Sequence, residues 1–168
     1  MESMRSCFSR NPLTAGRCIL IAVDGSECSK QAFHYYLKWI ARPDDSLVIF
    51  HAIEPVSLPS MSINNLGSVP SDEWSKIVQN NLQRVKELES EYAAECQAHN
   101  VTHQFLYEAV DQTGEAIVVK AARHHARLVI LGSRGLGVFR RTIMGSISDY
   151  VLHHANIPVC VVPLNAET

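Results

Sequence analysis

The residues of this chain best suited to chemistry lie in one glycine-rich stretch, GSRGLGVFRRTIMGSIS, at positions 132–148. Glycines allow a backbone to approach a ligand closely. Ser146 and Ser148 open a predicted helix, and the free N–H groups and positive dipole end of a helix favour an anion there. Three arginines add positive charge to the same stretch: Arg134, Arg140 and Arg141. Together these features predict a cradle for a polyphosphate.

Two common phosphate motifs do not describe this stretch. The Walker sequence GxxxxGK[ST] is absent from the chain, and a dinucleotide fingerprint belongs after the first strand, whereas this stretch follows the fourth predicted strand. Glycine-rich turns after a strand also occur without any ligand. On glycine content alone, a tight turn and a phosphate site therefore both stay open.

The elements that must position these residues alternate along the chain. Short apolar runs predict five strands, and segments with apolar residues three or four apart predict the helices between them. The strands are expected at 17–23, 46–53, 101–110, 127–131 and 158–162. The helices are expected between Ser26 and Pro43, from 71 to about 99, from 111–114 onward, and from about 146 to 155. This order predicts an α/β fold, a single-domain open sheet of five parallel strands flanked by helices.

In such a sheet, ligands bind beyond the carboxyl ends of the strands, near a change in strand order. Three predicted loops lie at those ends, at 24–26, 53–55 and 132–148. The third carries most of the polar and glycine residues. We therefore expect the third loop to be the most informative about a ligand.

Spacing within the stretch narrows the prediction. Gly132, Gly135, Gly145 and Ser146 resemble the ATP-binding signature of the universal stress protein family, G-x2-G-x9-G-[ST], without gap or substitution. VDGSE after the first strand, HAIEP after the second, ILGSRG after the fourth and NIPVCVVP at the end are similar to the same family. The resemblance implies a Rossmann-like fold of the adenine nucleotide alpha hydrolase type, ATP binding in many members, and frequent homodimers.

The resemblance also implies a role for individual residues. Asp24 would lie near adenine and ribose, although an Asp before Gly in such a turn often only supports the turn. Arg140 and Arg141 are possible phosphate contacts. The implied nucleotide-binding residues are Ala22, Val23, Asp24, Ala52, Leu131, Gly132, Arg134, Gly135, Gly145, Ser146, Ile147 and Ser148. Mg²⁺ or Mn²⁺ would bind through the phosphates, because no metal ligand stands out among the side chains.

Composition limits the classes of protein that remain. The 168 residues carry a net charge of −2 and are 46% hydrophobic, which suits one folded domain and argues against general nucleic-acid binding or docking on an acidic membrane. We expect a flexible segment at 1–16, the domain at 17–163 and a tail at 164–168. Five widely spaced cysteines without a CxxC pair favour reduced thiols and a cytoplasmic location.

The favoured function is an ATP-binding regulatory or stress-response module with an unknown protein partner. The alternatives are a slow ATP hydrolase and a nucleotide-free interaction module. The sequence contains no recognisable pair of nucleophile and base that would define a catalyst. ATP would order residues 132–145 and the proline-rich segment 54–71. The apolar last strand, from Pro158 to Val162, is expected at a sheet edge and would pair with a second copy.

Overall fold

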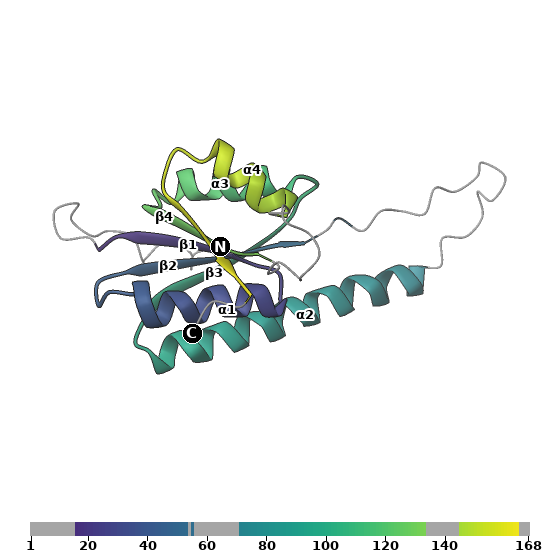
Figure 1. The fold of residues 1–168 in the computed structure, drawn as a ribbon. Helices are drawn as coiled ribbons and strands as arrows, with labels where there is room; N and C mark the ends of the chain where they lie inside the picture. Colours follow the sequence, from purple (N-terminus) through teal and green to yellow (C-terminus); the bar gives the residue numbers. More distant parts are fainter. Residues whose placement is uncertain (1–15, 54, 56–70, 134–144, 165–168) are drawn as a thin grey trace.

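The fold is an open parallel sheet between two layers of helices (Figure 1). The computed structural model describes residues 16–53, 55, 71–133 and 145–164. The strand order is β3-β2-β1-β4-β5, and every neighbouring pair is parallel. The strands are β1 (Cys18–Val23), β2 (Ser46–Ile53), β3 (Thr102–Ala109), β4 (Leu128–Ser133) and β5 (Val159–Pro163). This confirms the predicted class and the predicted edge position of the fifth strand.

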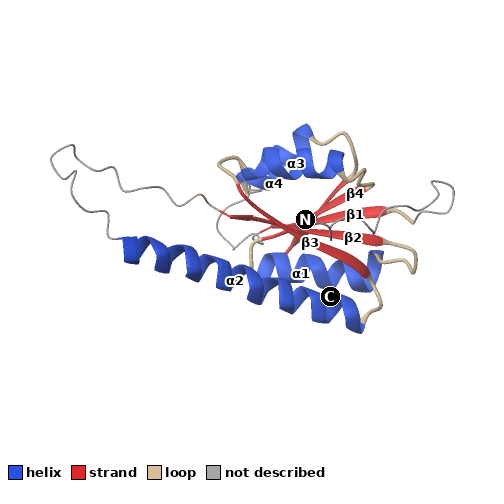
Figure 2. Cartoon of the chain, turned by 180° about the vertical axis from the view of Figure 1, so that it is seen from behind, coloured by secondary structure: helices blue, strands red, loops and turns tan. Residues whose placement is uncertain are grey.

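The helices divide between the two faces of the sheet. Figures 1 and 2 show α1 and α2 on one face and α3 and α4 on the other. The elements are α1 (Glu27–Tyr35), the π-helical turn η1 (Tyr36–Ile40), α2 (Ser71–Ala98), α3 (Thr113–Arg123) and α4 (Ser146–His154). None of the helices in the described part of the chain is long and apolar enough to cross a membrane.

Alternating side chains of the strands fill two cores. Ile19 and Ile21 of β1 point toward α1 and α2, whereas Leu20 points toward α3 and α4. All three side chains are fully buried. This two-sided burial explains why the central strands read as continuous apolar runs rather than as alternating patterns.

Element boundaries differ from the sequence prediction in two instructive places. The first predicted helix changes to a π-helical turn at Tyr36, which ends where the Ala41 N–H donates to the Tyr36 carbonyl oxygen at 2.8 Å. The fourth strand continues through Gly132 and Ser133, which pair with Val162 and Pro163 of β5. The first glycine of the predicted loop is thus part of the sheet.

Helix α2 extends past the sheet that it covers, as Figure 1 shows. Its 28 residues span about 42 Å at 1.5 Å per residue, whereas the eight-residue strand β3 spans about 26 Å. The apolar stripe predicted for this helix is consequently buried only in its second half. Tyr92 and Cys96 are buried, but Ile77 and Leu82 are 45% and 42% exposed.

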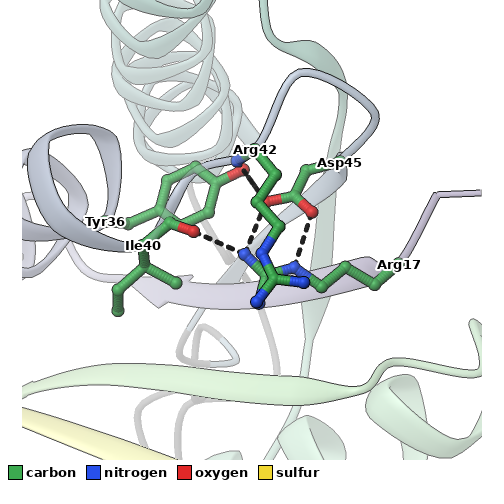
Figure 3. Close-up of polar contacts among 5 residues, drawn as sticks. All are labelled: Arg17, Tyr36, Ile40, Arg42 and Asp45. Atoms are coloured by element: carbon green, nitrogen blue, oxygen red, sulfur yellow. Dashed lines mark hydrogen bonds and ion pairs between the residues drawn. The ribbon is translucent and has the colours of Figure 1, made fainter.

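A buried carboxylate joins the segments that precede β1 and β2 (Figure 3). Asp45 accepts hydrogen bonds from Arg17 Nε at 2.7 Å and Nη2 at 3.1 Å. It also accepts from the Arg42 backbone N–H at 2.9 Å and from the Tyr36 hydroxyl at 3.3 Å. Arg17 additionally donates to the Ile40 carbonyl oxygen, so one ion pair fixes the end of η1 against the amino end of the sheet.

Candidate functional site

The strand order reverses between β1 and β4, and this reversal places the predicted site. The chain runs outward from β1 to β2 and β3, then crosses back to β4 on the other side of β1. Ala22 near the end of β1 lies directly beside Leu131 of β4. The carboxyl ends of two adjacent strands, whose chains then leave in different directions, form the crevice in which open α/β sheets bind ligands.

The turn after β1 is closed by its own side chains. Asp24 accepts a hydrogen bond from the Ser26 N–H at 2.9 Å, and Ser26 Oγ caps α1 by accepting from the Ser29 N–H at 3.3 Å. Gly25 adopts a φ of +78°, which suits glycine in this tight turn. Burial opposes ionisation of the Asp24 carboxyl, but hydrogen bonds from Ser26 and Ser29 outweigh it and hold the pKa of Asp24 below its ordinary value.

Asp24 therefore has the turn-supporting role that its position before glycine suggested. The residue is exposed, so its carboxylate is also accessible from solvent. Its lowered pKa keeps the carboxylate form further below neutral pH than the ordinary value of 3.8 would. An accessible carboxylate at the end of β1 is suited to accept hydrogen bonds from hydroxyl or amino groups of a ligand.

Gly132 is required by packing between β4 and α1. A Cβ at this position would lie 2.3 Å from the Cys28 carbonyl oxygen and 2.8 Å from the Ser29 backbone nitrogen. Both atoms belong to backbone, which cannot rotate away as a side chain could. The first glycine of the motif thus lets α1 approach the carboxyl end of β4, a role that the sequence did not reveal.

Gly145 presents the opposite case. It precedes α4 with φ −56° and ψ 148°, which other residues adopt readily. A Cβ there would meet no atom of the described chain within 4 Å. Neither backbone conformation nor packing within the described residues explains why this position is glycine.

The first backbone N–H groups of α4 have no side-chain cap. The first N–H groups of a helix have no partners within the helix, and Gly145 has no side chain to cap them. Because β5 runs parallel to β4, α4 must return from the carboxyl edge of the sheet, which puts this uncapped terminus at the same edge as Asp24. Ser26 caps α1, whereas neither α3 nor α4 has a side-chain cap. Of these two uncapped helix starts, the one of α4 follows β4, at the strand-order reversal, and is suited to an anion there.

The structure brings together most of the described residues that the sequence singled out. Ala22 and Val23 end β1 and Asp24 follows them. Leu131 and Gly132 lie in neighbouring β4, and Ala52 is half-buried in β2. At α4, Ser148 is 5% exposed, Ile147 is 43% exposed and Ser146 is exposed. Four predicted contacts lie outside the described residues: Arg134, Gly135, Arg140 and Arg141. Most of segment 54–71 lies outside them as well.

Sequence reasoning missed two residues that shape this edge. Ser29 is 4% exposed and bridges the turn, since its hydroxyl donates to the Ser26 carbonyl oxygen at 2.9 Å and accepts from the Asp24 N–H at 3.4 Å. His51 Nδ1 lies 2.8 Å from the Val23 carbonyl oxygen. The spacing of Ser29 three residues after Ser26 was the available signal for the first. The contact of His51 with Val23 depends on the register between β1 and β2, which the sequence alone does not reveal.

Histidines at helix ends bind backbone rather than gathering into a chelate. His153 and His154 each place Nδ1 2.8 Å from a carbonyl oxygen one turn earlier in α4. His125 follows α3 in a left-handed conformation, with φ 51°. Across the described ranges, no group of three or more His, Cys, Asp or Glu side chains is placed to hold a metal ion.

Comparison with known proteins decides the family. The profile of the Universal stress protein family matches residues 17–163. The chain belongs to this family. A universal stress protein from Synechocystis, Sll1388, is 28% identical over 149 residues, covering 86% of this chain and 96% of the relative. Another, from Mycolicibacterium smegmatis, is 27% identical over 150 residues, and there the chain spans only 47% of the relative's length.

Solved universal stress proteins share the fold. The Arabidopsis thaliana protein At3g01520, crystallised with AMP bound, superimposes with a TM-score of 0.67 at 21% identity, covering 90% of this chain and 94% of that one. A universal stress protein in complex with cAMP gives a TM-score of 0.63 at 18% identity, covering 90% and 99%. At these identities the likeness establishes the architecture of the sheet and its helices.

Proposed function

We propose that this universal stress protein binds an adenine nucleotide, ATP in particular, and that occupancy of the site sets its regulatory or stress-response output. The observation that carries the proposal is the uncapped start of α4 at Gly145, beside the strand-order reversal between β1 and β4. Two relatives of the same fold hold AMP and cAMP, which supports an adenine nucleotide as the ligand class.

The residues divide between the two ends of such a ligand. The ends of β1 and β2, with Asp24 and Ala52, would face adenine and ribose. The backbone N–H groups of Ser146, Ile147 and Ser148 would face the phosphates, where the helix dipole favours negative charge. Mg²⁺ or Mn²⁺ would be held by phosphate oxygens, because the described side chains offer no cluster of metal ligands.

Gly145 provides the sharpest test of this arrangement. A methyl group at position 145 would enter space that the described residues leave open, so Gly145→Ala should change the stability of the free protein little. Replacing glycine by alanine at a helix N-cap lowers the free energy of unfolding by up to about 1 kcal/mol. The same change restricts the unfolded chain, which raises the free energy of unfolding by about 0.4–1 kcal/mol and offsets that loss. If phosphates approach this backbone closely, the affinity for ATP should fall at least about tenfold.

Isothermal titration calorimetry with ATP, ADP and AMP measures the affinity, and urea denaturation measures the stability. Gly132→Ala is the matched control, because its Cβ would collide with the α1 backbone and should destabilise the fold by about 1–3 kcal/mol. No binding by the unmodified protein would refute the proposed function. Unchanged ATP affinity in Gly145→Ala would refute the assignment of the phosphate end to α4.

We also propose that the chain forms a homodimer through β5. This edge strand pairs with β4 on one side, and Val159, Cys160 and Val161 are each half-buried in a single copy. An apolar strand edge is usually covered or paired. Sedimentation velocity at micromolar concentration should show a dimer, and Val161→Lys should shift it to monomer. A monomeric unmodified protein would contradict the proposal.

A further inference from the structure

The peptide unit that follows β1 is held from both of its sides. Its carbonyl oxygen, on Val23, lies 2.8 Å from His51 Nδ1, and its N–H, on Asp24, donates to Ser29 Oγ at 3.4 Å. Because a carbonyl oxygen can only accept, His51 Nδ1 carries the proton of the first bond. One side chain from β2 and one from α1 therefore fix the orientation of this peptide unit.

His51 lies at the point where β1 leaves the sheet. Val23 and His51 are the last pair that β1 and β2 form, whereas β2 continues beside β3 as far as Ile53. Val23 is buried, so its carbonyl oxygen needs partners within the protein. The half-buried imidazole of His51 supplies such a partner where the pairing between the two strands stops.

The direction of the Asp24 side chain depends on this peptide unit. The Cα of Asp24 is one of the six atoms of the planar unit, so a rotation of the unit would redirect the carboxylate. The carboxylate accepts a hydrogen bond from the Ser26 N–H at 2.9 Å, and the residue is exposed. A carboxylate has about four lone-pair sites, which leaves capacity for hydroxyl groups of a ligand.

We infer that His51 is a positioning residue for the ribose end of the candidate site, where its Nδ1–H holds the Asp24 carboxylate in the direction from which ribose hydroxyls are bound. This inference rests on the proposed function. It requires no movement on binding, because the bonds that fix the turn are present in the free protein. A binding group that is already oriented costs less entropy to engage. His51 thus favours nucleotides with ribose hydroxyls without touching them.

ATP and 2′,3′-dideoxy-ATP test this role, since they differ only in the two ribose hydroxyls. Hydrogen bonds to a charged acceptor should make the unmodified protein prefer ATP at least about tenfold. His51→Leu removes the donor and should reduce this preference to about twofold, by weakening ATP and leaving 2′,3′-dideoxy-ATP unchanged. His51→Asn should keep most of the preference, because its side-chain amide can place an N–H donor close to the position of Nδ1.

Control variants separate positioning from general stability. Tyr36→Phe removes a hydroxyl that pairs with Asp45 at the amino end of the sheet, so it should melt lower and keep the full preference for ATP. His51→Leu should melt about 2–4 °C lower, the shift expected from losing one hydrogen bond in a chain of this size. Gly145→Ala acts at the proposed phosphate end and should weaken both nucleotides equally.

A double-mutant cycle tests whether His51 acts through Asp24. Asp24→Asn removes the charge that accepts the ribose hydroxyls, so adding His51→Leu to this variant should change the preference for ATP no further. An undiminished effect of His51→Leu in the Asp24→Asn background would overturn the inference. Calorimetry measures both affinities on the full chain, and scanning fluorimetry measures the melting temperature of each variant.

The remaining outcomes distinguish the inference from the proposed function. If His51→Leu keeps the preference for ATP or weakens both nucleotides equally, or if the unmodified protein binds both nucleotides equally well, the inference fails and the proposed function stands. If the unmodified protein binds neither nucleotide, both fail together. Should His51→Leu not fold, Ser29→Ala tests the same peptide unit from its other side: it should lower the preference for ATP, and an unchanged preference would overturn the inference.

Discussion

The ion pair between Arg17 and Asp45 allows a quantitative prediction about the stability of the fold. Asp45 is 3% exposed and accepts four hydrogen bonds, from two nitrogens of Arg17, the Arg42 N–H and the Tyr36 hydroxyl. Asp45→Asn preserves the size of the side chain but removes its charge. It also replaces one acceptor oxygen by an NH₂ group, which must face at least one of these donors.

The expected loss follows from the burial of the two partners. Breaking a buried ion pair by removing one charge costs about 3–5 kcal/mol. The Arg17 side chain remains 24% exposed and can regain some hydration, which favours the lower end, near about 3 kcal/mol. For a chain of this size each kcal/mol shifts the melting temperature by roughly 2–4 °C, so Asp45→Asn should melt about 6–12 °C lower.

Urea denaturation at neutral pH measures the free energy of unfolding, and scanning fluorimetry measures the melting temperature. Asp44→Asn is the control, because the adjacent carboxylate is exposed and its loss should change stability by no more than about 0.5 kcal/mol. A loss below about 1 kcal/mol in Asp45→Asn would show that the pair behaves like an exposed surface contact. Equal losses in both variants would show that net charge, rather than the buried network, is responsible.

Two further predictions concern the turn after β1. Gly25→Ala should destabilise the protein by about 1–2 kcal/mol because of its φ of +78° alone, since a Cβ there would have ordinary contact with Leu88 at 3.7 Å; Gly25→Asn should cost less, and equal urea midpoints for the two variants would contradict this reasoning. Asp24 has a folded-state pKa below its ordinary value of 3.8, so as pH falls the unfolded state binds the proton first. The stabilisation of the folded state by ionised Asp24 is complete above pH 3.8 and is lost as pH falls through the lower folded-state pKa. The melting temperature of Asp24→Asn should therefore decline less steeply between pH 5 and pH 3 than that of the unmodified protein, and parallel profiles would refute the assignment.

The sequence predicted the elements well because their signals are local. Cys18–Val23 and Ser46–Ile53 are apolar runs that only a strand covered on both faces would bury, and Ser26 marks the start of α1 by its capping chemistry. The motif beginning at Gly132 pointed to the family that the profile then confirmed. The solvent exposure of the first half of α2 was predicted less well, because the spacing of apolar residues does not reveal that a helix extends beyond the sheet it covers.

What the tertiary structure alone decided is which of these residues meet. Strand order put Ala22 beside Leu131, although 108 intervening residues separate them in the sequence. Packing showed that Gly132 accommodates the α1 backbone while Gly145 leaves open space, a difference invisible in a motif that treats both as glycine. Burial gave Asp45 its importance, because the energy of a polar group depends on its partners and on its distance from water. Residue types and spacing determine local structure, but partners across the sheet are set only when the chain closes into its three-dimensional fold.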